Sequence, residues 1–421
     1  MQYKAFLSNC NVVDVVTGAV LENQCIAIGT DGTIAKIFDD DDNSHNKDEF
    51  NKTALQTLDC QGGYVIPGLI DCHVHITAFT GNFAELERTS PSYVTARAIL
   101  ELQATLRRGV TTIRDAGGAD HGLARALQEG HIQGPRLLFC GKALSQTGGH
   151  GDMRAPGDFA KAFDCTCAGL GRVCDGDAQV RRATRDEIRK GATHIKVMAG
   201  GGVASPTDRI TSTQFSLMEL CAIVEEATAA NIHVMAHAYT PRAIINSVKA
   251  GIKSIEHGNL IDQEAAQFMA KHGTYLVPTL ATYDALAKEG IKNGLSQDMI
   301  AKVDNVLDAG KRAIRIAQEG GVTMCYGSDL LADMRQYQLT GLGLLEESGM
   351  APLHVLQSAT INAAKLTGLD DEIGTVQVGK VADLVVLKKN PLQSSMRTVF
   401  GDWEENYLAV FRAGQQVELL P

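Results

Sequence analysis

The sequence lacks any apolar stretch long enough to serve as a targeting or membrane-spanning segment. Its first residues, Met1 to Phe6, contain no apolar core of signal-peptide length. No apolar run approaches the roughly 20 residues that a membrane span needs. An excess of positive charge is absent too, because the net charge is −10, which disfavours nucleic acid and anionic membranes as partners. We therefore expect a cytoplasmic protein that binds neither nucleic acid nor membrane.

Two motifs that would indicate other chemistry are also missing. The glycine-rich stretch 199–206 is not followed by Gly-Lys-Ser/Thr, so it is not a phosphate-binding loop. The ten cysteines include Cys165, Cys167 and Cys174, but their spacing fits no standard zinc pattern. We interpret the cysteines as mostly free thiols in a reducing compartment.

The length of 421 residues suits one barrel-sized domain together with a smaller one. Both ends of the chain have the apolar patterns of β-strands. Near the N-terminus, Asp31-Gly32 between apolar runs predicts a hairpin, and the acidic stretch 39–49, with His45, is interpreted as a solvated loop. Strands are also expected at 373–380, 382–387 and 407–420. We expect the two ends to pair into one small composite β-sandwich domain of residues 1–66 and 369–421.

Between these ends, short apolar runs alternate with helical patterns. Eight runs are typical of buried strands, at 68–75, 110–115, 136–140, 194–198, 233–237, 254–257, 275–279 and 322–329. Amphipathic patterns predict helices at 92–108, 216–230, 299–319 and 352–367. Strands that alternate with helices form parallel β/α units, and eight such units indicate a closed (β/α)8 TIM barrel. The expected fold class is therefore α/β, with the barrel at residues 67–368.

Side chains that can bind metals occur on five of these strands, mostly at the carboxyl ends, where such barrels carry their chemistry. Alternate side chains of a strand point the same way, so His73 and His75 face one mouth of the barrel. The other donors are Lys196, His237, His257 and Asp329. We set aside His233, which begins its strand and so lies at the wrong end, together with His194 and His272.

Lys196 differs from the other donors because an ammonium group repels divalent cations. A carbamate formed with carbon dioxide would turn the same side chain into an anion that can bridge two metal ions. The alternative is an ordinary lysine that pairs with an acidic neighbour. On the residues alone, both interpretations stay open.

Together, these motifs resemble those of the amidohydrolase superfamily. The matching segments are His73-Val74-His75 after Pro67-Gly68, Lys196, His237, His257, Gly327-Ser328-Asp329 and, in the tail, Gly374-Thr375-Val376, Gly379-Lys380 and Ala382-Asp383-Leu384. The resemblance spans nearly the whole chain and implies a hydrolase with two divalent metal ions, usually Zn²⁺. It implies that His73, His75 and Asp329 bind one ion and that His237 and His257 bind the other. Lys196, as N6-carboxylysine, would bridge both.

Two divalent ions acidify a shared water, which supplies a hydroxide nucleophile near pH 7, and one ion polarises the substrate carbonyl. Asp329 can accept the proton of the attacking hydroxide and pass it to the leaving nitrogen. An amide requires this step because its nitrogen leaves poorly unless it is protonated.

Three further residues are candidates for substrate binding. His150 follows two glycines that allow a ligand to approach, and it could hydrogen-bond a carbonyl oxygen; the alternative is a loop histidine without a role. Tyr239 shares a strand face with His237 and is either a substrate contact or a packing residue. Arg209 could bind a substrate carboxylate or be simply solvated.

Within the superfamily, the stretches 148–151 and 200–206 and His237-Ala238-Tyr239 are similar to one metal-dependent branch. It holds Xaa-Pro dipeptidases (prolidases), Xaa-Arg/Lys carboxypeptidases and ochratoxin-hydrolysing amidases, with imidazolonepropionase more distant. The resemblance implies hydrolysis of an amide next to a free carboxylate, in a dipeptide or an N-acyl amino acid. His150 would assist at the carbonyl, and Tyr239 would hold the carboxylate.

Three alternatives remain open. They are a cyclic amidase like imidazolonepropionase, a metal-dependent deaminase, and a non-catalytic relative. Deaminases of this superfamily usually lack the bridging lysine, so Lys196 counts against the second. A homo-oligomer is also expected. The sequence does not predict the groups on either side of the amide, because specificity depends on loop shapes.

Overall fold

The computed structural model describes residues 2–40, 47–155, 157, 168–293 and 295–419. The chain divides into two compact units. The chain-end unit comprises Met1–Asp71, Gln103–Thr112 and Met350–Pro421, and the central unit comprises Cys72–Leu102 and Ile113–Gly349. Within the expected acidic loop, residues 41–46 with His45 lie outside the described residues, as do Cys165 and Cys167. The eight described cysteines are all free.

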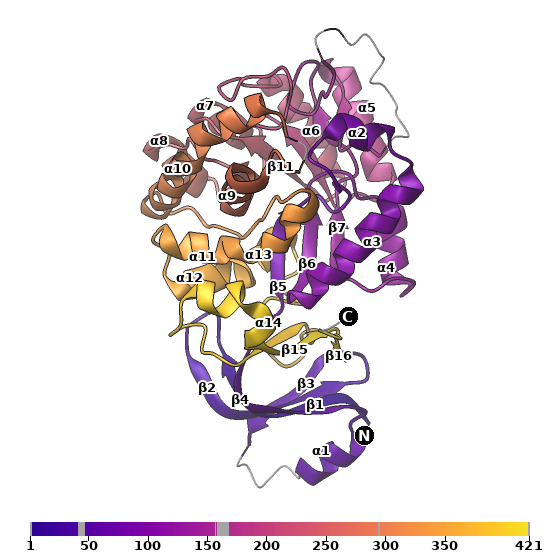
Figure 1. The fold of residues 1–421 in the computed structure, drawn as a ribbon, viewed down its shortest axis with the longest axis vertical. Coiled ribbons are helices and arrows are strands. Elements are labelled where there is room, and N and C mark those ends of the chain that lie inside the picture. Colours follow the sequence, from indigo (N-terminus) through magenta and orange to yellow (C-terminus); the bar gives the residue numbers. More distant parts are fainter. Residues whose placement is uncertain (1, 41–46, 156, 158–167, 294, 420–421) are drawn as a thin grey trace. The chain divides into compact units, whose positions relative to one another are not determined.

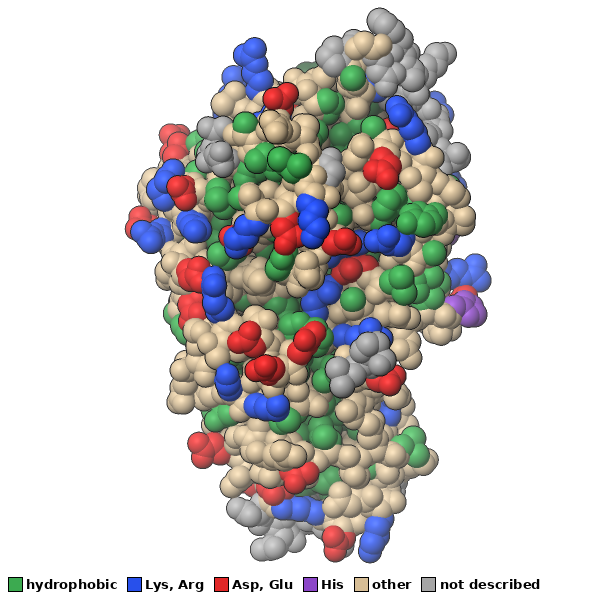
Figure 2. Space-filling view, in the orientation of Figure 1, with side chains coloured by type: hydrophobic (Ala, Val, Ile, Leu, Met, Phe, Trp, Pro, Cys, Tyr) green, Lys and Arg blue, Asp and Glu red, His purple; other side chains and the backbone are tan. Residues whose placement is uncertain are grey.

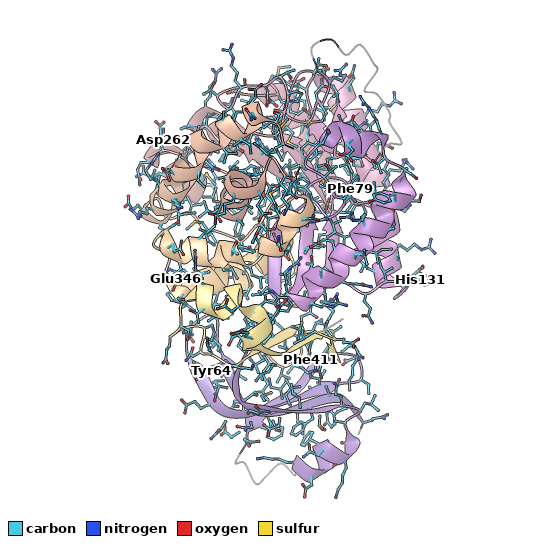
Figure 3. The ribbon with its side chains drawn as sticks, viewed as in Figure 1. Tyr64, Phe79, His131, Asp262, Glu346 and Phe411 are labelled. Atoms are coloured by element: carbon cyan, nitrogen blue, oxygen red, sulfur yellow. The ribbon has the colours of Figure 1, made fainter. Side chains whose placement is uncertain are left out.

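Strands from both ends of the chain pair in one seven-stranded sheet of the chain-end unit, in the order β16-β15-β14-β4-β1-β2-β3 (Figure 1). Their bounds are β1 Tyr3–Val13, β2 Val20–Gly29, β3 Ile34–Asp39, β4 Thr57–Pro67, β14 Leu384–Leu387, β15 Tyr407–Arg412 and β16 Gln415–Gln416. β1 pairs with β4 in parallel, and the other neighbours are antiparallel. Figure 3 labels Tyr64 and Phe411 on β4 and β15, the strands that flank β14.

The predicted hairpin at Asp31-Gly32 is present between β2 and β3. Gly32 has a φ of +82°, and a Cβ there would lie 2.4 Å from the carbonyl oxygen of Ala413, so the turn requires glycine. The predicted strand at 373–380 is wrong. Gly374 and Gly379 have φ values of +91° and +90°, which break an extended backbone into turns.

Parallel strands followed by helices build the central unit, where β10 to β13 pair in sequence order. One sheet has the order β13-β12-β11-β10-β8-β9 and another the order β5-β6-β7. Their bounds are β5 Leu69–Val74, β6 Val110–Asp115, β7 Arg136–Phe139, β8 Ala143–Ser145, β9 Gly171–Val173, β10 His194–Met198, β11 His233–Ala238, β12 Ser254–His257 and β13 Tyr275–Val277. Seven of the eight strands predicted for the middle of the chain are therefore present. The bounds of β6, β10 and β12 are as predicted, and those of the other four differ by one or two residues.

The eighth predicted strand, at 322–329, is wrong as a regular strand, because Met324 alone forms a bridge, to Leu276. The segment nevertheless lies between strands β13 and β5 and forms hydrogen bonds with both. Its Cys325 N–H donates to Leu276 O of β13 at 2.9 Å, and its Tyr326 O accepts from Cys72 N of β5 at 2.8 Å. Asp329 has a φ of +55°, which turns the backbone out of the extended conformation.

The described helices are α1 Lys47–Thr53, α2 Phe83–Arg88, α3 Pro91–Arg107, α4 His121–Gln128, α5 Gly176–Arg189, α6 Leu217–Ala229, α7 Pro241–Lys249, α8 Gln263–Lys271, α9 Leu280–Glu289, α10 Gln297–Glu319, α11 Thr340–Glu347, α12 Pro352–Ser358, α13 Ile361–Thr367 and α14 Trp403–Asn406. A 3₁₀-helix spans Ala332–Tyr337 and a π-helix Arg397–Gly401. The helix predicted at 352–367 is two helices, because Thr360 leaves the helical conformation. α6 begins with a capping box between Ser216 and Glu219.

Within the described part of the chain, no helix combines the length and the apolarity needed to cross a bilayer. On the visible face of the central unit, acidic and basic side chains are interspersed (Figure 2). Arg181 and Arg185 of α5, for example, both pair with Glu226 of α6. Mixed charge of this kind differs from the basic stripe that nucleic acids require.

Candidate functional site

One pocket of the central unit is lined by every side chain that the sequence predicts as a metal ligand. These are His73, His75, Lys196, His237, His257 and Asp329. His73 lies in the buried strand β5, and His75 comes directly after this strand. His237 and His257 stand near or at the ends of β11 and β12, and Lys196 is the middle residue of β10.

Asp329 lies among the imidazoles. Its Oδ1 is 3.3 Å from Nε2 of both His73 and His75, and its Oδ2 is 3.8 Å from His257 Nδ1. His73, His257 and Asp329 each offer a ligand atom within 4.8 Å of the other two. The ring centroids of His237 and His257 are 4.5 Å apart. The donors are therefore close enough for a cation to touch several of them.

A buried ion pair orients His73. Its Nδ1 lies 2.8 Å from Glu256 Oε2, while Arg114 donates to Glu256 Oε1 at 2.9 Å. Burial acts to raise the pKa of Glu256. The positive charge of Arg114 and the hydrogen bond from His73 lower it by more, so the pKa is well below its usual value. The ionised carboxylate accepts a hydrogen bond from Nδ1–H of His73, which leaves Nε2 as the nitrogen that faces Asp329.

The other imidazoles are oriented in the same manner, each through one ring nitrogen. His75 Nδ1 donates to Gly117 O at 3.1 Å, and His237 Nε2 donates to Gly201 O at 3.1 Å. His257 Nδ1 lies 2.7 Å from Thr279 Oγ1. Burial lowers the pKa of His237 and His257 well below the usual value, so both rings are neutral, as metal ligation requires.

Lys196 is 1 % exposed and forms no ion pair with a described residue. Burial lowers the pKa of its amine, and the carboxylates of Glu256 and Asp329 oppose this only in part. Burial acts to raise the pKa of Asp329, but His73 and the neighbouring imidazoles outweigh it and hold the pKa well below its usual value. An amine of lowered pKa, an anion and four oriented imidazoles are a donor set that fits divalent cations.

His150 and Tyr239 line the same pocket. The ring of His150 stacks on His237 with centroids 4.3 Å apart, and the Tyr239 ring is 4.8 Å from His237. Arg209 is exposed and does not line the pocket, so the structure does not bring it together with the other predicted residues. His194, His233 and His272 do not line it either.

Sequence reasoning missed several residues that hold the site together. Tyr283 of α9 lines the pocket and donates to Tyr239 Oη at 2.9 Å. Glu256 stands directly before the predicted ligand His257, but its contact with His73 joins strands far apart in the sequence. Its position in a run predicted as a buried strand was the signal that could have identified it, because a buried carboxylate needs a partner.

The rest of the pocket lining is largely apolar. It includes Phe83, Met153, Leu170, Met198, Leu286 and Leu331. Apart from Lys196, Asp329 and the histidines, the described lining carries no charged side chain.

The fold and the buried histidine–aspartate cluster agree with the comparison to known proteins. The chain matches the Amidohydrolase family over residues 64–417 and belongs to that family, which typically binds divalent metals. It is a hydrolase that acts on carbon–nitrogen bonds.

Three relatives illustrate the similarity. The chain is 36% identical over 343 residues to ochratoxinase from Aspergillus niger, covering 78% of this chain and 71% of the relative. It is 26% identical to imidazolonepropionase from Pseudomonas putida, covering 79% and 81%. A solved prolidase complexed with N-methylphosphonate-L-proline has a TM-score of 0.92 and 42% identity, covering 98% of this chain and 99% of that one.

Proposed function

We propose that the protein is a binuclear metal hydrolase that cleaves an amide or peptide bond next to a free carboxylate. The observation that carries this proposal is the pocket in which six donors, among them a buried lysine of lowered pKa, surround one space. The substrate is a small molecule, either an Xaa-Pro-type dipeptide or an N-acyl amino acid.

In this proposal His73, His75 and Asp329 hold one ion, and His237 and His257 hold the other. Lys196, as N6-carboxylysine, binds both, and its lowered pKa supports this role because only a neutral amine reacts with carbon dioxide. Zn²⁺ suits a set of imidazole and carboxylate ligands. When bound, the ions would supply acidified water and polarisation of the substrate carbonyl.

The protein's own groups then move protons and hold the substrate. Asp329, anionic and central, accepts a proton during attack and returns it to the leaving nitrogen. His150 acts at the carbonyl oxygen of the substrate. Tyr239 binds the substrate carboxylate; its Oη accepts a hydrogen bond from Tyr283, so its own proton is available for a second partner.

The apolar lining supports substrates with apolar groups around the amide, such as prolyl or aromatic residues. The relatives agree with this choice, since their names refer to ochratoxin and to proline derivatives. A basic leaving residue would find no carboxylate in the described lining other than Asp329. Arg209 remains a second candidate for the substrate carboxylate, on the exposed side.

We also propose a closed (β/α)8 barrel at residues 67–368 and a composite β-sandwich of 1–66 and 369–421. The hydrogen bonds of the segment 322–329 to β13 and to β5 support the closure. The seven-stranded sheet with strands from both chain ends supports the composite domain.

A hydrolysis screen of the purified protein tests the proposal. It compares Xaa-Pro dipeptides and N-acyl amino acids with the same compounds whose carboxylate is converted to an amide. We expect the free acids to be cleaved with a higher kcat/KM. Preference for the amidated forms, or cleavage of imidazolone or amino-purine substrates instead, would favour the cyclic amidase or the deaminase and refute the proposal.

A further inference from the structure

A buried carboxylate that the proposed function does not use lies behind His150. The Nδ1 atom of His150 is 3.0 Å from Ser205 Oγ and 3.4 Å from Asp208 Oδ2. Ser205 Oγ in turn donates to Asp208 Oδ1. Both residues are buried, at 1% and 8% exposure. The glycine-rich stretch that follows β10 thus places a hydroxyl and a carboxylate against one imidazole.

These contacts determine which nitrogen of His150 carries a proton. A serine hydroxyl has one proton, and here Asp208 accepts it, so Ser205 Oγ faces His150 as an acceptor. His150 Nδ1 must therefore be a donor. The second ring nitrogen, Nε2, is left for the pocket that His150 lines.

The surrounding loop fixes Asp208 in turn. Its Oδ2 accepts from the backbone N–H of Gly202 at 3.0 Å and from Gln214 Nε2 at 2.9 Å. The Oε1 atom of the same Gln214 accepts from the backbone N–H of His150 at 2.8 Å. Gln214 thus ties the carboxylate and the main chain of His150 to each other.

The ring of His150 is packed between close neighbours. It stacks on His237, and it lies so close to Gly202 that a Cβ there would be 2.2 Å from His150 Cε1. This packing and the Nδ1 contacts together favour the observed orientation of the ring.

We propose that Asp208 is a positioning residue for amide hydrolysis. Through Ser205 and by its own contact, it holds the tautomer and the orientation in which His150 presents Nε2 to the substrate carbonyl. A carboxylate that holds a histidine in its working tautomer is a recurring arrangement in hydrolases. The inference rests on the proposed role of His150.

The variant Asp208→Asn tests the inference, because it keeps the size of the side chain but replaces an acceptor by a donor. We expect kcat to fall at least ~10-fold, with KM changed less than about threefold, since His150 stays in place but loses its fixed tautomer. Ser205→Ala is a smaller change that should also lower kcat. It replaces Asp208→Asn as the test if that variant does not fold.

A double-mutant cycle separates this role from a structural one. In a His150→Gln background, Asp208→Asn should change kcat less than about twofold, because the group through which it acts is gone. If Asp208→Asn costs the same factor in both backgrounds, Asp208 does not act through His150.

Lys302 of α10 offers a matched control. Its Nζ donates to Ser205 O and Asp208 O, both at 3.1 Å, and lies 4.0 Å from Asp208 Oδ1. It therefore ties the same loop, while the structure records no contact between Lys302 and His150. Lys302→Met should leave kcat within about threefold of wild type, because the contacts of His150 Nδ1 with Ser205 and Asp208 stay in place. An equal loss of kcat in Lys302→Met would mean that loop order, and not His150, is affected.

A second readout does not depend on turnover. In NMR spectra of metal-free protein with ¹⁵N-labelled histidine, the Nδ1–H signal of His150 is assigned as the one that disappears in His150→Gln. We expect this signal in the wild-type protein and its loss in Asp208→Asn. A signal retained in Asp208→Asn would overturn the inference. If the wild-type enzyme cleaves none of the amides in the screen, the proposed function fails, while this spectroscopic result still decides the Asp208–His150 contact.

Discussion

At the scale of single residues, burial determines the protonation states on which the site depends. The rings of His237 and His257 are neutral because desolvation disfavours their charged forms, and the same effect lowers the pKa of the Lys196 amine. Asp329 behaves in the opposite way, because the imidazoles around it keep it anionic despite burial. The pKa values of all three side-chain types are thus shifted in the direction that metal binding needs.

The proposed carbamate gives the first prediction. Lys196→Ala removes the anion that would bind both ions, so we expect loss of most of the metal and of the activity. Added formate or acetate should restore part of both, because a small carboxylate can enter the space that the lysine leaves. Metal content by mass spectrometry and kcat are the measurements; full zinc and full turnover in the variant would exclude the carbamate.

Asp329→Asn addresses proton transfer. An amide side chain still offers an oxygen to a metal but cannot shuttle a proton, so turnover should fall at least ~10²-fold while part of the metal remains. Steady-state kinetics and metal analysis on the same sample check this. Turnover within about threefold of wild type would assign the proton transfer to another group.

The tyrosine pair provides a prediction about substrate recognition. Tyr239→Phe should weaken transition-state binding of substrates with a free carboxylate by about 1–3 kcal/mol, typical of a charge-assisted hydrogen bond. Substrates with an amidated carboxylate should barely respond. The ratio of kcat/KM for acid and amide forms is the measurement, and an unchanged ratio would make Tyr239 a packing residue.

Tyr283→Phe is the matched variant, because it removes the hydrogen bond to Tyr239 Oη and leaves the Tyr239 phenol in place. We expect it to shift the same ratio in the same direction by a smaller factor. A shift in Tyr283→Phe without one in Tyr239→Phe would place the carboxylate contact at Tyr283.

Most of the predicted metal ligands came from one simple property, the position of a donor at or near the end of an expected strand. Lys196, in the middle of β10, is the exception. Glu256, Tyr283 and Asp208 were missed because their partners lie far away in the sequence and become visible only when the chain is folded. Arg209 was chosen for its charge, whereas the buried contact is made by its neighbour Asp208.

At the scale of elements, strand and helix positions were predictable where the apolar pattern was regular, as in β10 to β12 and in α3, α6 and α10. The pattern failed where backbone conformation decides. Positive φ values at Gly374, Gly379 and Asp329 interrupt runs whose apolar residues resemble those of strands. Such breaks depend on local turns and on neighbouring strands, which a periodic pattern does not encode.

A histidine at the other end of the site-bearing strand β11 predicts how stability depends on pH. Burial, together with the charges of Arg114 and Lys253, lowers the pKa of His233 to about 3, although Glu256 opposes the shift. The ring of His194 stacks on that of His233. In the unfolded chain the ordinary pKa is 6.5. Between these values the unfolded state binds more protons, so the free energy of unfolding falls as the pH falls from about 6.5 towards 3.

His233→Gln removes this proton uptake. Between pH 7.5 and pH 5 the variant should lose about 1–2 kcal/mol less stability than wild type. Urea unfolding of both metal-free proteins at the two pH values gives the comparison, and each protein serves as its own reference. Equal losses in the two proteins would show that His233 is not held neutral by the fold.

At the scale of the whole molecule, the family match extends over residues 64–417. It includes β14, β15, β16 and the last residues of β4, where the two chain ends pair, but not β1 to β3. The pairing of the chain ends followed from two β patterns, each too short to form a domain alone. Cytoplasmic location and a homo-oligomeric state remain predictions from the sequence.

The binuclear centre is the central claim, and a metal titration tests it most directly. The protein is stripped with a chelator and titrated with Zn²⁺ in bicarbonate buffer, while cleavage of the best amide from the screen is followed. The account predicts that activity rises from near zero and reaches a plateau at two ions per chain, more slowly when carbon dioxide is excluded. Full activity without metal, or a plateau at one ion, would contradict it.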